Sequence, residues 1–185
     1  MDKAGKGTKE KTSKLRRIIQ YSVATAAILL LIFLGLEVYK FYSLSADKLF
    51  NEKYEPYDLM TTRDTTESKI ERAYREKKYS DVVKLNPNSG LSVNDVFLTG
   101  VAFLETGDYS KAISSFQVVI SETKDVRTSV LKDAAEYYMA LAYLQNHDYD
   151  EAIDLMNTIH DNPSHFYSER FSEKYINRIK RLKWR

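Results

Sequence analysis

The sequence predicts an all-α protein in which one N-terminal transmembrane helix precedes a short solenoid of helical repeats. Three observations predict this fold. Residues 18–36 carry no charge over a length that suits a membrane-spanning helix. A pattern of small and aromatic residues at positions 100–116 recurs 40 positions later. Apolar residues also repeat at helical spacing near the C-terminus. We therefore expect two full repeats, one degenerate repeat and a C-terminal capping helix after the membrane helix.

Residues 1–17 form a basic tail at the N-terminus. Seven basic and two acidic residues give this tail a charge of 7 − 2 = +5, whereas residues 18–185 carry 21 − 24 = −3. The tail has no apolar periodicity, so we expect it to be flexible. A docking peptide for a cytoplasmic partner or for anionic lipid is the alternative interpretation.

Residues 18–36 are the predicted membrane span. These 19 residues are rich in Ala, Ile, Leu and Phe, and as a helix they would reach about 28 Å, close to the thickness of the hydrocarbon core. Basic residues stay on the cytoplasmic side of a membrane, so the tail predicts a cytoplasmic N-terminus. We therefore expect a single-pass protein of the inner (plasma) membrane with a periplasmic, or otherwise extracytoplasmic, C-terminal domain. A cleaved signal peptide and a buried core helix are the alternatives.

The segment after the span is predicted to link it to the folded domain. Residues 18–42 hold the transmembrane helix and the start of a stalk, and residues 43–63 are a stalk or linker. Pro56 interrupts the helical pattern, because proline favours an extended residue before it. Tyr54 and Tyr57 flank this proline, and we expect them to pack on the first helix pair.

Residues 64–185 are the predicted repeat domain, and its first unit is degenerate. Tyr79 stands 30 positions before Tyr109, which marks the equivalent helix start in the next unit. Lys77 takes the place of the turn glycine in that unit. Residues 86–90, rich in Asn, Pro and Gly, cut the second helix short.

Two full units follow. Each is predicted as a helix, a short turn and a second helix, because glycine, asparagine or aspartate interrupts the apolar pattern between them. Small residues are needed where two helix axes approach closely, and aromatic residues then fill the space beside them. The equivalent positions are Gly100 and Ala140, Phe103 and Tyr143, Gly107 and His147, Tyr109 and Tyr149, Ala112 and Ala152, and Phe116 and Met156.

This pattern resembles the tetratricopeptide repeat (TPR) family, whose period is about 34 residues. The six additional residues are expected in a polar linker at positions 124–129. The resemblance implies a right-handed superhelix whose first helices line a concave groove for a peptide or a partner helix. The groove residues that it implies are Asn94, Phe97, Val101, Leu104 and Glu105 in the first full unit and Ala134, Tyr137, Leu141, Leu144 and Gln145 in the second.

This implied groove is apolar and aromatic with a few amides, which suits a hydrophobic peptide or an amphipathic helix. The Lys and Arg clamp by which some TPR proteins hold a carboxylate is absent, since no basic residue occupies these positions. In the alternative interpretation, the stalk or the C-terminal helix fills the groove.

The last predicted helix spans residues 166–184 and has Tyr175 and Ile179 among its apolar residues at helical spacing. We expect it to cap the open end of the solenoid. Its final turns are basic, which the helix dipole favours. Contact of this basic end and Trp184 with anionic lipid is the alternative.

The sequence predicts a protein that is not an enzyme. It contains no Gly-rich phosphate loop, no His-Glu-x2-His motif, no Gly-x-Ser-x-Gly motif and no cysteine. We expect no metal, no cofactor and no small-molecule substrate, because the three histidines have no metal-ligand spacing with carboxylates. We also expect no nucleic acid, because residues 18–185 are net negative.

We therefore interpret the chain as a membrane-anchored adaptor or scaffold that binds a protein partner at the outer face of the inner membrane. Its topology and repeats resemble bacterial envelope TPR proteins, which implies a role in assembling envelope complexes or in assisting the secretion translocon or its chaperones. The alternative is a transmembrane signalling regulator that sequesters a cytoplasmic factor.

Overall fold

The computed structural model describes residues 25, 27–39, 42–59, 67–85, 91–123 and 129–184. The chain divides into two units, Met1–Leu44 and Ser45–Arg185. In the first unit, residues 27–39 are helical and their side chains are exposed. Within the described residues, no helix is both long enough and apolar enough to cross a membrane. The predicted basic tail and residues 18–24 and 26 of the predicted span lie outside the described residues, so the membrane span stays a prediction.

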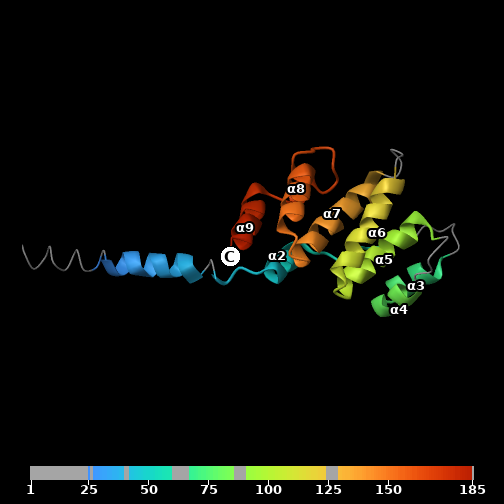
Figure 1. Cartoon of the computed structure of the whole chain (residues 1–185), viewed down its shortest axis with the longest axis horizontal. Coiled ribbons are helices and arrows are strands. Elements are labelled where there is room, and N and C mark those ends of the chain that lie inside the picture. The colour runs from blue at the N-terminus through green and yellow to red at the C-terminus, as the bar shows by residue number, and fades with distance from the viewer. Residues whose placement is uncertain are drawn as a thin grey trace, which may run out of the picture. The chain divides into compact units, whose positions relative to one another are not determined.

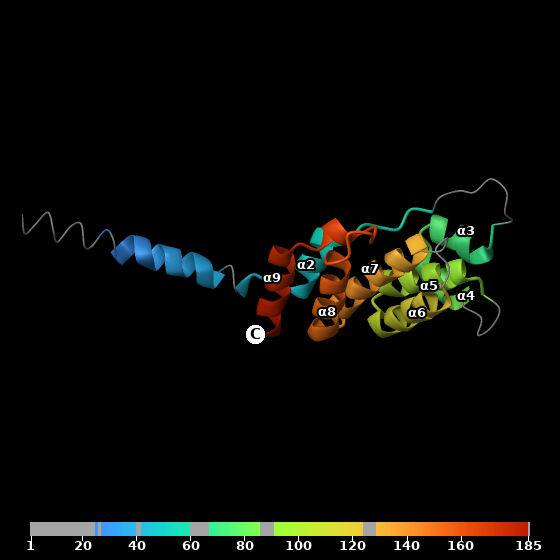
Figure 2. The ribbon, with the colours of Figure 1, turned by 90° about the horizontal axis from the view of Figure 1, so that it is seen from above.

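Every regular element described in the second unit is a helix (Figure 1). Consecutive helices pack in sequential pairs, α3 with α4, α5 with α6 and α7 with α8, and each pair packs on the next. Figure 2 shows the same succession from above. The predicted all-α repeat fold is therefore confirmed for this unit. Its helices are α2 (Ala46–Lys53), α3 (Lys69–Arg75), α4 (Tyr79–Leu85), α5 (Val93–Glu105), α6 (Tyr109–Glu122), α7 (Ser129–Gln145), α8 (Tyr149–His160), the 3-10 helix η2 (Ser168–Arg170) and α9 (Glu173–Lys183).

The three helix pairs turn through equivalent residues. Lys77, Gly107 and His147 have positive φ angles of 55°, 81° and 65°. In each pair the following N–H donates back to a carbonyl of the first helix, which is the Schellman arrangement that ends many helices. Lys77 therefore occupies the turn position predicted for it in the degenerate unit. The three bonds are Lys78 N to Ala73 O at 2.9 Å, Asp108 N to Phe103 O at 2.9 Å and Asp148 N to Tyr143 O at 3.0 Å.

Small residues allow the paired helices to approach closely. A Cβ atom added at Gly100 on α5 would lie 2.8 Å from Cε1 of Phe116 on α6, so only glycine fits without a shift of this ring. Ala112 and Ala152, at equivalent positions of α6 and α8, are 0% exposed. The small residues predicted at the helix contacts therefore face the interior.

The C-terminal helix begins later than predicted. The predicted start at residue 166 is wrong, because residues 161–172 form turns and η2 before α9 begins at Glu173. Ser172 sets this start, since its side chain accepts a hydrogen bond from the N–H of Tyr175. α9 packs on α8 and on α2. Within the second unit, α2 and α9 lie at one end and α3 and α4 at the other (Figure 1, Figure 2).

Candidate partner-binding groove

The structure buries most of the predicted groove residues. They come from α5 and α7, the first helices of the two full units, which contact each other. Asn94 is half-buried and Glu105 is exposed. The remaining predicted residues are interior residues of the second unit, namely Phe97, Val101, Leu104, Ala134, Tyr137, Leu141, Leu144 and Gln145.

The chain's own stalk contacts the predicted groove at Phe97, Tyr137 and Glu105. Residues 45–59, which comprise α2 and an extended stretch after it, are here called the docked segment. Leu49 of this segment is 0% exposed. The Tyr57 ring contacts the Phe97 ring edge-on with centroids 4.7 Å apart, and the Tyr54 ring contacts Tyr138 at 6.1 Å. The docked segment therefore occupies part of the predicted groove, and the binding of a partner by the groove residues stays a prediction.

Tyrosine hydroxyls of the repeats hold the main chain of the docked segment. Four of them donate to its carbonyl oxygens from α3, α7 and α9. Such hydrogen bonds recognise the main chain of the bound segment and do not depend on the identity of its side chains. The bonds are Tyr74 to Tyr57 O at 3.0 Å, Tyr138 to Glu55 O at 2.8 Å, Tyr137 to Lys53 O at 2.5 Å and Tyr175 to Leu49 O at 2.8 Å.

These tyrosines stay protonated at neutral pH. Burial raises the pKa of Tyr137 to about 12. Burial also raises the pKa of Tyr74, Tyr138 and Tyr175 above the ordinary tyrosine value. A phenol with a raised pKa keeps its proton and acts as a hydrogen-bond donor. The groove therefore presents fixed donors to a main chain.

Two ion pairs fasten the docked segment to the C-terminal part of the chain. Nη1 of Arg178 lies 2.6 Å from a carboxylate oxygen of Glu52. Arg170 donates from both terminal nitrogens to the carboxylate of Glu55, with one contact at 3.0 Å. The hydrogen bond and the positive charge of Arg170 lower the pKa of Glu55. Both pairs are partly exposed, so each adds little to the free energy of unfolding. Their main effect is to fix the position of the docked segment along the repeats.

The structure also brings together three potential metal ligands that the sequence spacing does not reveal. Asp133 and Glu136 lie one turn apart on α7, and His165 comes from the turn after α8, with one ligand atom of each within 4.8 Å of the others. The two carboxylates have helical spacing, but no sequence signal connects them with a histidine about 30 positions later.

The hydrogen bonding of His165 favours a donor over a metal ligand. Its Nδ1 accepts the N–H of Tyr167 at 3.1 Å. A neutral imidazole that accepts at Nδ1 carries its proton on Nε2, so the tautomer is assigned from this contact. Nε2 is buried and lies 3.2 Å from Oε2 of Glu136 without an aligned hydrogen bond. The protonated Nε2 therefore faces the carboxylates of Asp133 and Glu136 on α7.

Comparison with protein families decides the nature of the repeats. Residues 96–122 and 134–164 match the model of the tetratricopeptide repeat family. These two segments are TPRs. The first lies within α5 and α6, and the second covers most of α7 and all of α8. No curated protein and no solved structure matches the chain significantly.

Sequence reasoning missed the tyrosine donors of the groove. Tyr137 is a predicted groove residue, whereas Tyr74, Tyr138 and Tyr175 fit the helical packing pattern and give no sign of a second role. Their acceptors are main-chain carbonyls up to 126 positions away in the chain. A carbonyl carries no signal in the sequence, so this part of the site required the structure.

Proposed function

We propose that the protein is a membrane-anchored TPR adaptor, without enzymatic activity, that holds a protein partner at the outer face of the inner membrane. The anchor is residues 18–36, the N-terminus is cytoplasmic and the TPRs are extracytoplasmic. TPRs suggest protein–protein binding. The partner contributes a hydrophobic peptide or helix, in a process such as envelope-complex assembly or assistance to the secretion translocon.

The observation that carries this proposal is the row of tyrosine donors in the groove. They already bind a helix followed by an extended stretch through its main-chain carbonyls. A partner segment of the same form has the same carbonyls and can replace residues 45–59. It would fill the site of Leu49 with an apolar side chain and could pair an acidic side chain with Arg170 or Arg178.

The docked segment competes with such a partner. Because it belongs to the same chain, its local concentration is high. The apparent affinity of a partner falls in proportion to the fraction of molecules whose groove is open. Loosening the docked segment should therefore strengthen partner binding, while damage to the groove itself should weaken it.

The test is photo-crosslinking in intact cells from position 137 in the groove, with position 118 on α6 as the matched control. Val118 is 48% exposed and lies outside the groove. We expect capture of one protein from position 137 above the control, with more capture when Leu49→Ala loosens the docked segment. Leu49→Ala should lower the free energy of unfolding by about 2–5 kcal/mol, so circular dichroism checks that the variant is folded. Leu49→Val is a gentler second variant, since it removes one methylene group from the docked segment and leaves every groove residue unchanged.

Two outcomes would contradict the proposal. Capture from position 137 equal to that from position 118 would exclude a partner in the groove. Crosslinking from position 137 only to residues 45–59 of its own chain, also in the loosened variants, would make the docked segment a permanent part of the core.

A further inference from the structure

The outer face of α9 carries basic side chains that form no ion pair within the described residues. α9 has five basic residues and one acidic residue, Glu173, which gives 5 − 1 = +4. Arg178 pairs with Glu52 and Lys183 with Asp150. Lys174, Lys180 and Arg181 are exposed, and in the described part of the chain no ion pair is formed by any of them. These three unpaired residues are all positively charged.

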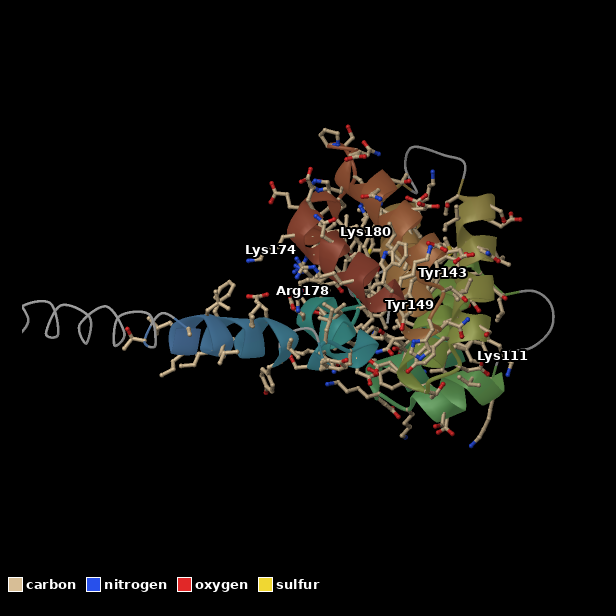
Figure 3. The ribbon with its side chains drawn as sticks, turned by 60° about the vertical axis from the view of Figure 1, so that its left-hand side comes forward. Lys111, Tyr143, Tyr149, Lys174, Arg178 and Lys180 are labelled. Atoms are coloured by element: carbon tan, nitrogen blue, oxygen red, sulfur yellow. The ribbon has the colours of Figure 1, made fainter. Side chains whose placement is uncertain are left out.

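A tryptophan adjoins this charge. Trp184 follows α9 directly and is 85% exposed, the largest exposed fraction among the large hydrophobic residues of the described chain. The opposite side of the helix is buried through Tyr175, Ile176, Ile179 and Leu182. At 100° per residue, Lys180, Arg181 and Trp184 fall on the side away from these residues. Figure 3 labels Lys174, Arg178 and Lys180 along this helix.

α9 lies at the end of the second unit where the chain enters from the predicted anchor. It packs on α2, and Tyr175 of α9 donates to Leu49 O of α2 at 2.8 Å. Nine residues, 37–45, connect Leu36, the end of the predicted span, to Ala46, the start of α2, and a chain of this length reaches at most about 35 Å. The helices α3 and α4 lie at the other end of the unit (Figure 1).

We propose that the outer face of α9, with Trp184, binds the anionic phospholipid headgroups of the membrane in which the chain is anchored. This inference rests on the membrane anchor of the proposed function. Lysine and arginine are attracted to anionic headgroups, and tryptophan favours the interface between headgroups and acyl chains. Residues 18–185 carry a net charge of −3, whereas α9 alone carries +4, so α9 is a surface that such a membrane attracts. The contact fixes which side of the TPRs faces the solvent.

Trp184 is the only tryptophan of the chain, so its fluorescence reports on this contact alone. The full-length protein is reconstituted into vesicles of phosphatidylcholine with or without 30% phosphatidylglycerol. With the anionic lipid we expect a blue-shifted Trp184 emission and quenching by a nitroxide-labelled lipid. Both effects should weaken in about 0.5 M salt, where the Debye length is only a few ångströms. Each basic residue contributes about a fivefold preference for the anionic surface.

Lys180→Gln with Arg181→Gln is the test variant, and Lys69→Gln with Lys84→Gln is the matched control at the other end of the unit. The test variant should lower the ratio of docked to undocked α9 about 25-fold, and the control should leave it unchanged. Vesicle flotation after an alkaline wash separates the two proposals. Failure to float would remove the anchor and this inference with it. Flotation with the same Trp184 emission in neutral and anionic vesicles would overturn the α9 contact and leave the anchor standing.

Discussion

The turn residue of each helix pair has a positive φ angle, and three different residue types adopt it. Glycine, at Gly107, adopts the left-handed conformation without steric cost. Lys77 and His147 adopt it at a cost of about 1–2 kcal/mol each. Nδ1 of His147 lies 2.7 Å from the hydroxyl of Tyr149, which offsets part of this cost. The Lys77 side chain makes no such contact within the described residues. Nothing there offsets the conformational cost at Lys77, in contrast to His147.

Lys77→Gly should therefore stabilise the protein. We expect the free energy of unfolding to rise by about 0.5–1 kcal/mol, because the relief of left-handed strain exceeds the entropy that glycine adds to the unfolded chain. Urea unfolding measures the difference. Gly107→Ala is the matched control and should lower the same quantity by about 1–2 kcal/mol, since alanine is strained at a φ of 81°. A Lys77→Gly variant less stable than the parent would show that strain at this turn is not what limits stability.

The docked segment joins elements that are distant in the chain. Its α2 packs on α7 and α9, and its extended stretch lies against rings of α5 and α7.

The ion pair between Glu55 of the docked segment and Arg170 depends on pH. The Arg170 guanidinium holds the pKa of the Glu55 carboxyl below the ordinary value of about 4.3.

A carboxyl with a depressed pKa in the folded state contributes stability above its unfolded pKa. We expect this contribution to be fully present above about pH 4.3 and to be lost as the pH falls through the lower folded pKa of Glu55. Carbon-13 NMR of the Glu55 carboxyl measures the titration. Arg170→Gln should return the midpoint to the ordinary range. A midpoint that does not change in Arg170→Gln would mean that the pair does not form in solution.

The helix pairs were predictable from the sequence because their contacts are local. Gly100 and Phe116 meet within one pair, where Ala112 is also buried, and the spacing of small and aromatic residues predicts this. The docked segment was not predictable to the same degree. The bonds from Tyr137 and Tyr138 join residues 84 and 83 positions apart, and their acceptors are carbonyls. The aromatic pattern alone could indicate a groove without showing what occupies it.

At the scale of the molecule, the division into two units separates the predicted anchor from the fold. The first unit ends at Leu44, and the second begins with Ser45, the N-cap of α2. The docked segment therefore belongs to the second unit, together with the repeats. Four hydroxyl donors, the buried Leu49 side chain and the Tyr57–Phe97 ring contact connect it to the repeats.

This division predicts different results for two deletions. Removal of residues 1–43, which keeps the buried Leu44, should leave the helical content and the thermal unfolding temperature of the second unit unchanged. Removal of residues 1–59 should cost about 5 kcal/mol or more, because each lost hydrogen bond contributes about 1 kcal/mol and burial of a leucine contributes about 2 kcal/mol. Small domains have about 5–15 kcal/mol in total, so this loss should lower the unfolding temperature markedly and expose Phe97 and Tyr138 to a hydrophobic dye. Differential scanning fluorimetry compares the two proteins. Equal stability of both would mean that the TPRs do not need residues 45–59, and the groove would then be free for a partner at no energetic cost.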